Sequence, residues 1–377
     1  MRGFFIHIAL LILPLIAGAQ VLDAEIESRL ADLPGVTEKL QTFERFGVKE
    51  PGTLALENTG LWLRDYATQL GYVVEFDSFQ DPLSRWQRNV VVTIPGTSTS
   101  RFMVLGAHYD TKRGTGTNDN GSGVVALMNT LEVLPDYRPL YGIRVVFFSG
   151  EEQGFHGSKH YVDSVLSKES GNLLLMLNVD QIGGTAGAEG NDKIYCERDE
   201  NNEPASNNQR SKLVTDTLAQ LTRLYTTLEP VISEAYSSDY EPFEDAGEII
   251  TGLYQFAPYP QTHTASDSLQ YLDSNSLNQA VRLVTAATMY FSGRETLNLR
   301  EHEMHELELF PNPASGLVIC SGLPNDAIVE IYDLKGAKAA QKHITNGSFE
   351  VSDLPQGVYV ITVPVDEKLF RARLVVQ

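Results

Sequence analysis

Two adjacent glutamates, Glu151 and Glu152, follow an apolar run at residues 143–150 of this 377-residue chain. A single carboxylate after a strand is ordinary, but a neighbouring pair can divide the work of catalysis. One carboxylate ligates a metal ion, while the other, pointing elsewhere, moves a proton. Further nitrogen and oxygen ligands lie just past other apolar stretches or in turn-rich loops: His108, Asp110, Asp119, Asp180 and His263. Together they supply the ligands that a hydrolytic site with two zinc ions requires.

Each of these residues also has a simpler interpretation. Asp119 lies in a Gly-flanked loop, where its carboxylate could bridge two metal ions about 3.5–4 Å apart. Alone, it would more often be a turn or helix-capping residue, because a helix is predicted from Ser122. His108 alone would more often be a hydrogen-bonded core histidine, and Asp110 could orient its imidazole ring. The coincidence of all the candidates, rather than any one of them, indicates a metal site.

Two rival sites have weaker support. His156 and His160 are four residues apart, the spacing of two ligands on one helical face, but Gly157 stands where the HExxH metalloprotease motif has glutamate. We therefore predict structural roles for both histidines. A serine nucleophile is not indicated, because the chain lacks the Gly-x-Ser-x-Gly elbow.

The elements that must position the candidates follow from the pattern of apolar residues. Continuous apolar runs indicate strands covered on both faces, and their alternation with helices indicates an α/β fold with a mixed, largely parallel twisted sheet flanked by helices. Ligands of such sheets bind beyond the carboxyl ends of the strands, where most of the candidates fall. The predicted strands cover residues 72–76, 89–94, 102–107, 144–149 and 173–179, and the predicted helices lie within residues 21–40, 60–70, 122–134 and 274–291.

Composition bounds the class of protein and its partners. With 42% hydrophobic and 21% charged residues, the chain can bury a substantial core. Its net charge of -20 argues against nucleic acid or an anionic membrane as a partner, because phosphate binding needs a basic face. Cys196 and Cys320 fall in separate predicted domains, which favours two buried, unpaired thiols over a disulfide.

The first 20 residues have the pattern of a secretory signal. Arg2 supplies the positive start, residues 4–16 the apolar segment, and Ala17-Gly18-Ala19 the small-residue cleavage site. The apolar run is shorter than the ~20 residues that a membrane span requires. We therefore expect an exported protein with a signal peptide at 1–20, an α/β domain at 21–293, a polar linker at 294–306 and a small all-β sandwich domain at 307–377.

Five blocks in the predicted α/β domain are similar to those of the M28 family of zinc aminopeptidases. They are Gly-Ala-His-Tyr-Asp-Thr at 106–111, Thr-Asn-Asp-Asn-Gly-Ser-Gly at 117–123, Phe-Phe-Ser-Gly-Glu-Glu-Gln-Gly at 147–154, Leu-Asn-Val-Asp-Gln-Ile-Gly at 177–183 and His-Thr at 263–264. The blocks occur in the family's order, and the resemblance covers about residues 22–293. It implies that the sheet is of the zinc-exopeptidase type.

The resemblance also implies how the candidates share the metal ions. Asp119 would bridge two zinc ions. His108 and Asp180 would complete one metal site, and Glu152 and His263 the other. The peptide bond between residues 119 and 120 is cis in relatives.

The same resemblance implies an activity. Glu151 would be the general base, acting on a water that bridges the metal ions, and Asp110 would hold His108. The expected reaction is the removal of N-terminal residues from peptides. A glutaminyl-peptide cyclase, which shares the scaffold and binds one zinc ion, and a carboxypeptidase-type member of the family are the alternatives, and a non-enzymatic surface-binding protein is a third.

One position departs from the family pattern. Some members carry a tyrosine immediately before the last histidine to stabilise the oxyanion, and here that residue is Thr262. Tyr240 and Tyr259 are candidates for this role, and the sequence favours neither.

The last 71 residues change to short β segments separated by turns. Leu-Phe-Pro-Asn-Pro-Ala at 309–314, Tyr-Asp-Leu-Lys-Gly at 332–336 and Leu-Pro-Gln-Gly-Val-Tyr-Val-Ile-Thr-Val at 354–363 are similar to the sorting domain of type IX secretion cargo. The resemblance implies passage through the outer membrane by that secretion machinery, and a secreted or cell-surface location. A carbohydrate-binding or adhesion module is the alternative.

Overall fold

The computed structural model describes residues 23–169, 171–200, 202–235, 237–293, 303–307, 309–320, 322–333, 338–365 and 368–377. These residues form two compact units, one within residues 22–297 and the other within residues 298–377. The predicted signal peptide and most of the predicted linker lie outside the described residues. Among the described helices, none combines the length and apolarity of a membrane-spanning segment.

The larger unit is built on an eight-stranded sheet. Its strands are β1 (Val73–Gln80), β2 (Trp86–Ile94), β3 (Ser98–His108), β4 (Tyr141–Phe148), β5 (Leu173–Val179), β6 (Lys193–Arg198), β7 (Glu229–Glu234) and β8 (Ile250–Gln255). They follow the order β1-β2-β4-β3-β5-β8-β6-β7. The central pairs β4–β3, β3–β5 and β5–β8 are parallel, as is β6–β7, while the other three pairs are antiparallel. This arrangement confirms the predicted mixed, largely parallel sheet.

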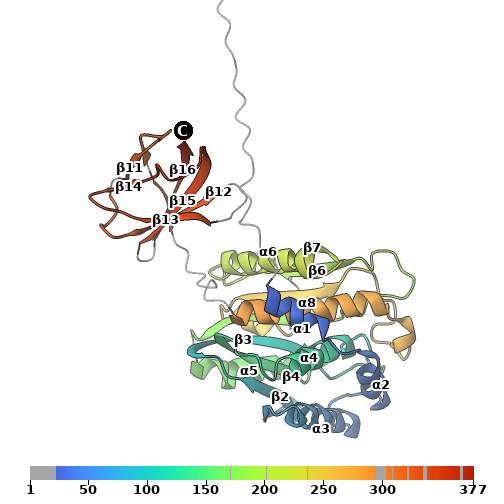
Figure 1. Ribbon diagram of the computed structural model, residues 1–377. Coiled ribbons are helices and arrows are strands. Elements are labelled where there is room, and N and C mark those ends of the chain that lie inside the picture. The colour runs from blue at the N-terminus through green and yellow to red at the C-terminus, as the bar shows by residue number, and fades with distance from the viewer. Residues whose placement is uncertain are drawn as a thin grey trace, which may run out of the picture. The chain divides into compact units, whose positions relative to one another are not determined.

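Helices cover both faces of this sheet (Figure 1). They are α1 (Ala24–Ala31), α2 (Thr37–Arg45), α3 (Leu54–Gln69), α4 (Gly121–Val133), α5 (His156–Ser164), α6 (Asn208–Tyr225), α7 (Glu241–Asp245) and α8 (Ser274–Gly293), with short 3-10 helices η1 (Glu151–Gln153), η2 (Leu166–Glu169) and η3 (Leu269–Tyr271). Neighbouring residues of β2 contact helices on opposite faces of the sheet, because successive side chains of a strand point to opposite faces. The side-chain nitrogen of Asn89 donates to the Gly157 carbonyl of α5 (2.9 Å), whereas the Arg88 side chain forms an ion pair with Glu57 of α3 (3.7 Å).

The central strands are rich in apolar residues because helices cover both of their faces. All of β5 is buried, and so is β3 from Phe102 to its end. Beneath α5 and α7, the rings of Phe148, Tyr161 and Phe243 pack together, with centroids 6.0 Å apart for Phe148–Tyr161 and 6.2 Å for Phe148–Phe243. The strands whose carboxyl ends carry the candidate residues therefore lie in the hydrophobic core.

The first helices differ from the prediction. The apolar spacing within residues 21–40 predicted one helix, but the chain forms α1 and α2, with the break at Pro34-Gly35, two residues that disfavour a helix interior. α3 also begins six residues earlier than predicted, because the Thr53 hydroxyl caps it by accepting from the Leu56 amide (3.2 Å). Gly60 then lies inside α3, where a Cβ atom would come within 3.0 Å of the Tyr109 hydroxyl.

The smaller unit contains two sheets around one core. Its strands form the orders β10-β11-β14 and β13-β12-β15-β16-β9, with the pairs antiparallel except for β16–β9. The bounds are β9 (Glu303–Glu306), β10 (Leu309–Phe310), β11 (Leu317–Cys320), β12 (Ile328–Asp333), β13 (Lys338–His343), β14 (Ser348–Glu350), β15 (Gly357–Val365) and β16 (Lys368–Val376). Val318, Ile331 and Ile361 are fully buried in this core. Cys196 and Cys320 are both free and buried, as predicted.

Candidate metal centre

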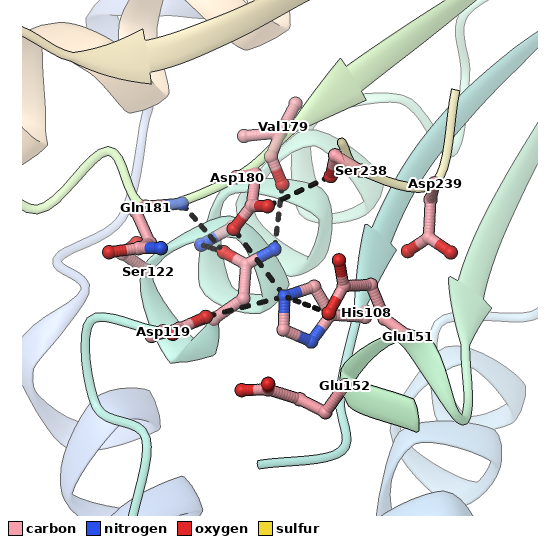
Figure 2. A network of polar contacts seen from close by, with 12 residues as sticks. His108, Asp119, Ser122, Glu151, Glu152, Val179, Asp180, Gln181, Ser238 and Asp239 are labelled. Atoms are coloured by element: carbon pink, nitrogen blue, oxygen red, sulfur yellow. Dashed lines mark hydrogen bonds and ion pairs between the residues drawn. The ribbon is translucent and has the colours of Figure 1, made fainter. Parts of the chain in front are cut away.

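The five candidate ligands meet at the carboxyl end of the central strands. Figure 2 shows four of them, His108, Asp119, Glu152 and Asp180. His108 ends β3, Glu152 lies in η1 directly after β4, and Asp180 follows β5. Asp119 precedes α4, and His263 lies in the loop after β8. Adjacent parallel strands β4, β3, β5 and β8 bring their ends to the same edge of the sheet, so residues separated by 155 positions of sequence share one site.

Two glycines allow this close approach. A Cβ atom on Gly106, two residues before His108, would lie 2.6 Å from both Met176 Cε and Phe148 Cε2, so β3 packs tightly on its neighbours. A Cβ atom on Gly123 would lie 2.5 Å from the Val179 carbonyl oxygen, so the first turn of α4 sits against the end of β5. The loop that carries Asp119 is thereby held next to Asp180.

Asn120 fixes the same junction by hydrogen bonds. Its side-chain oxygen caps α4 by accepting from the Gly123 amide (2.9 Å), and its side-chain nitrogen donates to the Val179 carbonyl (2.8 Å). The helix cap is therefore Asn120, which leaves the Asp119 carboxylate for another use. The Asp119–Asn120 peptide bond is cis, as the family resemblance implied.

The ligand atoms form two groups that share Asp119. In the first group, His108 Nε2 lies 3.4 Å from Asp119 Oδ1 and 3.4 Å from Asp180 Oδ1. In the second, His263 Nε2 lies 3.1 Å from Asp119 Oδ2 and 3.0 Å from Glu152 Oε2. The ligand atoms of each group lie within 4.8 Å of one another, a spacing that suits one cation in each. Asp119 thus directs one oxygen at each group, the geometry of a bridging carboxylate.

Buried ligand atoms without hydrogen-bond partners fit this interpretation. His108 Nε2, Asp180 Oδ1 and Glu152 Oε1 are all shielded from solvent and form no hydrogen bond. A buried polar atom without a partner is costly, and a cation would satisfy all three. Nitrogen from histidine and oxygen from carboxylates are the ligands that zinc prefers. The residues present therefore fit two zinc ions.

The charges of the ligand residues also favour bound metal cations. Burial opposes a charged imidazole, yet the Glu151 and Asp180 carboxylates raise the pKa of His108 well above its ordinary value. Burial also raises the pKa of Glu152 to about 7, with the Asp119 carboxylate adding to the effect. Because acidic groups crowd around the two histidines, the protein alone leaves the site short of positive charge, which metal cations would supply.

Glu151 lies beside the first ligand group and belongs to neither group. Its Oε2 atom is 3.9 Å from His108 Nε2 (Figure 2). Burial raises the pKa of this carboxyl group well above its ordinary value, outweighing the opposite effect of His108, and the Asp180 and Asp239 carboxylates raise it further. A carboxyl group with a raised pKa, one residue from a ligand, is placed to accept and release a proton.

Asp110 holds the turn that carries both glutamates. Its two carboxylate oxygens accept from the backbone amides of Glu151 (3.1 Å) and Glu152 (3.2 Å). The His108 ring instead approaches the Asp110 main chain, with Nδ1 3.1 Å from the carbonyl oxygen, against 3.7 Å from the nearest carboxylate oxygen. Asp110 therefore contacts His108 chiefly through its backbone, which differs from the side-chain contact expected from the sequence.

The chain matches known proteins along both units. The model of peptidase family M28 matches residues 89–288, more than half of the chain. The chain belongs to peptidase family M28. Residues 308–377 match the model of the secretion system C-terminal sorting domain.

Individual relatives of this M28 chain match it in part. It is 30% identical over 190 residues to aminopeptidase YwaD of Bacillus subtilis, an alignment that covers 48% of this chain and 39% of YwaD, so the chain spans about two fifths of that relative. Two solved structures resemble it in fold. BSAP, a zinc aminopeptidase from Bacillus subtilis, has a TM-score of 0.60 and 17% identity, covering 70% of this chain and 97% of BSAP. Macrostomum lignano glutaminyl cyclase has a TM-score of 0.60 and 18% identity, covering 74% of this chain and 96% of the cyclase.

The rival histidines of this M28 chain lie outside both ligand groups. His160 Nε2 pairs with Asp77 Oδ1 (2.9 Å), and its ring stacks on Phe79 with the centroids 5.1 Å apart. Burial lowers the pKa of His156. Neither histidine is among the described residues that could hold a metal ion. The contacts of His160 suit the predicted structural role, and the role of His156 stays a prediction.

The two tyrosines suggested for oxyanion stabilisation are engaged elsewhere. Tyr259 donates its hydroxyl hydrogen to Asp267 Oδ1 (2.9 Å), and Tyr240 is buried against Glu197. Thr262, at the position where some M28 members have tyrosine, donates to Gln181 Oε1 (2.9 Å).

Sequence reasoning missed several residues that support the ligands. Asp267 is nearly fully buried, and its carboxylate accepts from the backbone amides of Asn118 (2.8 Å) and Asp119 (3.0 Å). Ser238 donates to Asp180 Oδ2 (2.8 Å), which leaves Oδ1 facing His108. Asp239, also buried, lies close to Glu151 (Figure 2) and accepts from the Ser158 hydroxyl (2.6 Å). No local pattern marks these side chains, since each acts on a residue at least 58 positions away.

We expect Asp267→Asn to lower zinc affinity by about 10–100-fold, the usual effect of losing a group that orients a ligand. An amide can offer only one oxygen where two backbone N–H groups now find acceptors, so the loop that presents Asp119 would loosen. Zinc titration against a competing chelator measures the effect. Asp273→Asn is the matched control, because Asp273 caps α8 through the Ser276 amide (2.8 Å) and its side chain forms no hydrogen bond with the described residues of the ligand loop. Equal zinc affinity in the two variants would contradict the proposed role.

Proposed function

We propose that this chain is an exported metallopeptidase that binds two zinc ions and removes N-terminal residues from peptides. The observation that carries the proposal is the sharing of Asp119 between two ligand groups, with Glu151 beside the first group and in neither. Membership of peptidase family M28 supports hydrolysis of peptides. YwaD and BSAP, which their names describe as aminopeptidases, support the choice of the N-terminal bond.

The residues of the metal centre have separate roles in the proposed peptide hydrolysis. When bound, the zinc ions supply a Lewis acid that polarises the scissile carbonyl and lowers the pKa of water. Glu151 takes the proton from the attacking water and passes it to the departing amine. Asp110 keeps Glu151 in place by accepting from its backbone amide, and Ser238 orients Asp180. A misplaced base loses much of its effect, so these supports matter to the rate.

The groups beside the ligands suit a substrate with a free amine. The Glu151 carboxyl group lies next to His108 and can accept a hydrogen bond from an α-amine. Lys112 is close to the centre, but its Nζ atom lies 3.8 Å from Glu152 Oε2 and faces that ligand. The arrangement supports an aminopeptidase over a carboxypeptidase.

A glutaminyl-peptide cyclase is the second candidate, because the Macrostomum lignano cyclase has a similar fold. The cyclase class binds one zinc ion. Here both groups offer three protein ligands, which supports two ions and hence hydrolysis. The match to the secretion system C-terminal sorting domain supports export by that machinery, with a secreted or cell-surface location.

Metal counting combined with a substrate panel tests the proposal. We expect two zinc ions per chain in the purified protein, measured by mass spectrometry. We also expect release of free amino acids from peptides with a free N-terminus, and none from the same peptides with an acetylated N-terminus. One zinc ion with formation of pyroglutamate from an N-terminal glutamine would identify a cyclase. Release from the acetylated peptides at their C-terminal end would identify a carboxypeptidase.

A further inference from the structure

A buried asparagine, Asn178, lies two residues before the ligand Asp180, near the end of β5. Alternate residues of a strand point to the same face of its sheet. Asp180 prolongs the strand, because its backbone amide donates to the Leu253 carbonyl of β8 (3.1 Å). The side chains of Asn178 and Asp180 therefore share one face, where Ser238, from the segment between β7 and α7, contacts both.

These three side chains form a hydrogen-bond relay, the Asn178 relay, that ends at the metal centre. The side-chain nitrogen of Asn178 donates to Ser238 Oγ (2.9 Å), and the Ser238 hydroxyl donates to Asp180 Oδ2 (2.8 Å). Figure 2 shows the second of these contacts. Asn178 is 1% exposed, and Ser238 and Asp180 are also buried, so little water competes for the two hydrogen bonds.

The direction of the relay follows from the groups that form it. A hydroxyl group carries one hydrogen, which Ser238 can donate to one acceptor at a time. The amide nitrogen of Asn178 can only donate, so Ser238 Oγ accepts from it and keeps its own hydrogen for Asp180. Asp180 Oδ2 is thereby engaged, and Oδ1 faces His108 Nε2 at 3.4 Å. The relay thus determines which oxygen Asp180 presents to the first ligand group.

The stability of the fold does not explain the amide group of Asn178. Its side-chain oxygen is buried and has no hydrogen-bond partner among the described residues. A buried polar atom without a partner destabilises the folded state, so an apolar side chain would suit this position of β5 better. The contact of the amide nitrogen with Ser238 therefore accounts for an asparagine at this position.

The backbone around Ser238 is fixed independently of the relay. The Ser238 carbonyl accepts from the Glu241 amide at the start of α7 (2.9 Å), and the adjacent Asp239 accepts from the Ser158 hydroxyl of α5 (2.6 Å). The remaining freedom of Ser238 is the orientation of its hydroxyl group. The hydrogen bond from Asn178 restricts that orientation.

We propose that Asn178 is a positioning residue for the first zinc ion. It directs the Ser238 hydroxyl to Asp180 and thereby fixes the carboxylate oxygen that binds the metal. The inference rests on the two-zinc centre of the proposed function. Because Asp180 belongs to the first ligand group only, loss of the relay weakens zinc binding at that group and leaves the second group unchanged.

The test measures zinc affinity at each group separately in the full-length protein, by titration against a competing chelator. His263→Ala leaves three protein ligands in the first group only, and Asp180→Ala leaves three in the second group only. In the His263→Ala background, we expect Asn178→Ala to weaken zinc binding by about 10-fold, the lower end of the usual loss for a group that orients a ligand. In the Asp180→Ala background it should have no effect, because the carboxylate that it positions is gone.

Ser238→Ala separates the relay from a general effect on packing. In the His263→Ala background it should weaken zinc binding at least as much as Asn178→Ala does. Combining the two substitutions should cause no further loss, because Asn178 acts through Ser238. Asn178→Leu, which also lacks the amide but fills the space, is measured alongside and serves alone if circular dichroism shows that Asn178→Ala is unfolded.

Asn129→Ala is the matched control. Asn129 is another buried asparagine whose side-chain oxygen has no hydrogen-bond partner among the described residues, but its nitrogen donates to the Pro34 carbonyl (2.6 Å), outside the metal centre. Its variant should bind zinc with unchanged affinity in both backgrounds.

Three results would overturn the role of Asn178 alone: unchanged zinc affinity in the His263→Ala background, equal losses in both backgrounds, or additive losses from the Asn178 and Ser238 substitutions. Equal losses would mean that Asn178 supports the fold around the centre. A His263→Ala protein that binds no zinc would overturn both this inference and the two-zinc centre, and that failure would be seen before any change to Asn178.

Discussion

Replacing Glu151 with glutamine should lower turnover by about 10²–10⁴-fold without removing metal, the usual cost of losing a general base. Glutamine keeps the size of the side chain but cannot accept a proton at neutral pH. Metal binding should survive because Glu151 belongs to neither ligand group, and the Asp110 contact with its backbone amide does not depend on the side chain. The measurements are kcat on a peptide with a free N-terminus and zinc content by mass spectrometry.

The neighbouring glutamate provides the matched control for that experiment. Glu152→Gln changes the same chemical group one residue away, but it removes a ligand oxygen that lies 3.0 Å from His263 Nε2. It should therefore lose zinc from the second ligand group as well as activity. Unchanged turnover in Glu151→Gln would remove Glu151 from the mechanism. Loss of zinc from Glu151→Gln equal to that from Glu152→Gln would make it a ligand rather than a base.

The sequence predicted the part of the site that depends on strand ends. His108, Glu152 and Asp180 each follow a continuous apolar run, and such runs become central strands whose carboxyl ends share one edge. Asp119 and His263 lie in loops without a periodic pattern. Their residue types and turn-rich loops made them candidates, and the resemblance to M28 blocks then implied which metal ion each would bind. The structure then places all five side chains at one site.

The supporting residues could not be predicted from local pattern, because their contacts span long stretches of sequence. Asp267 holds the backbone of residues 118 and 119, about 150 positions earlier. Similarly, the outer elements β6, α6 and β7 have mixed polar and apolar residues, since one side of each is nearer to solvent. Their pairing is set by tertiary packing, which periodicity does not encode.

Asp119→Ala should abolish the binding of both zinc ions, a larger loss of metal than any other single ligand change should cause. Asp119 alone contributes to both ligand groups, with Oδ1 3.4 Å from His108 Nε2 and Oδ2 3.1 Å from His263 Nε2. Alanine removes both oxygens, so each group keeps only two protein ligands, fewer than the three that catalytic zinc sites use. Activity should fall below detection together with the metal.

Asp180→Ala is the control that isolates the bridge, because Asp180 contributes to the first group only. That variant should retain zinc at the group formed by Asp119, Glu152 and His263, giving close to one ion per chain where Asp119→Ala gives none. Circular dichroism must show that both variants remain folded, since loss of the fold would also release metal. Two zinc ions retained in folded Asp119→Ala would refute the bridge. Equal zinc loss in the two variants would mean that the ions bind as an inseparable pair, with no special role for Asp119.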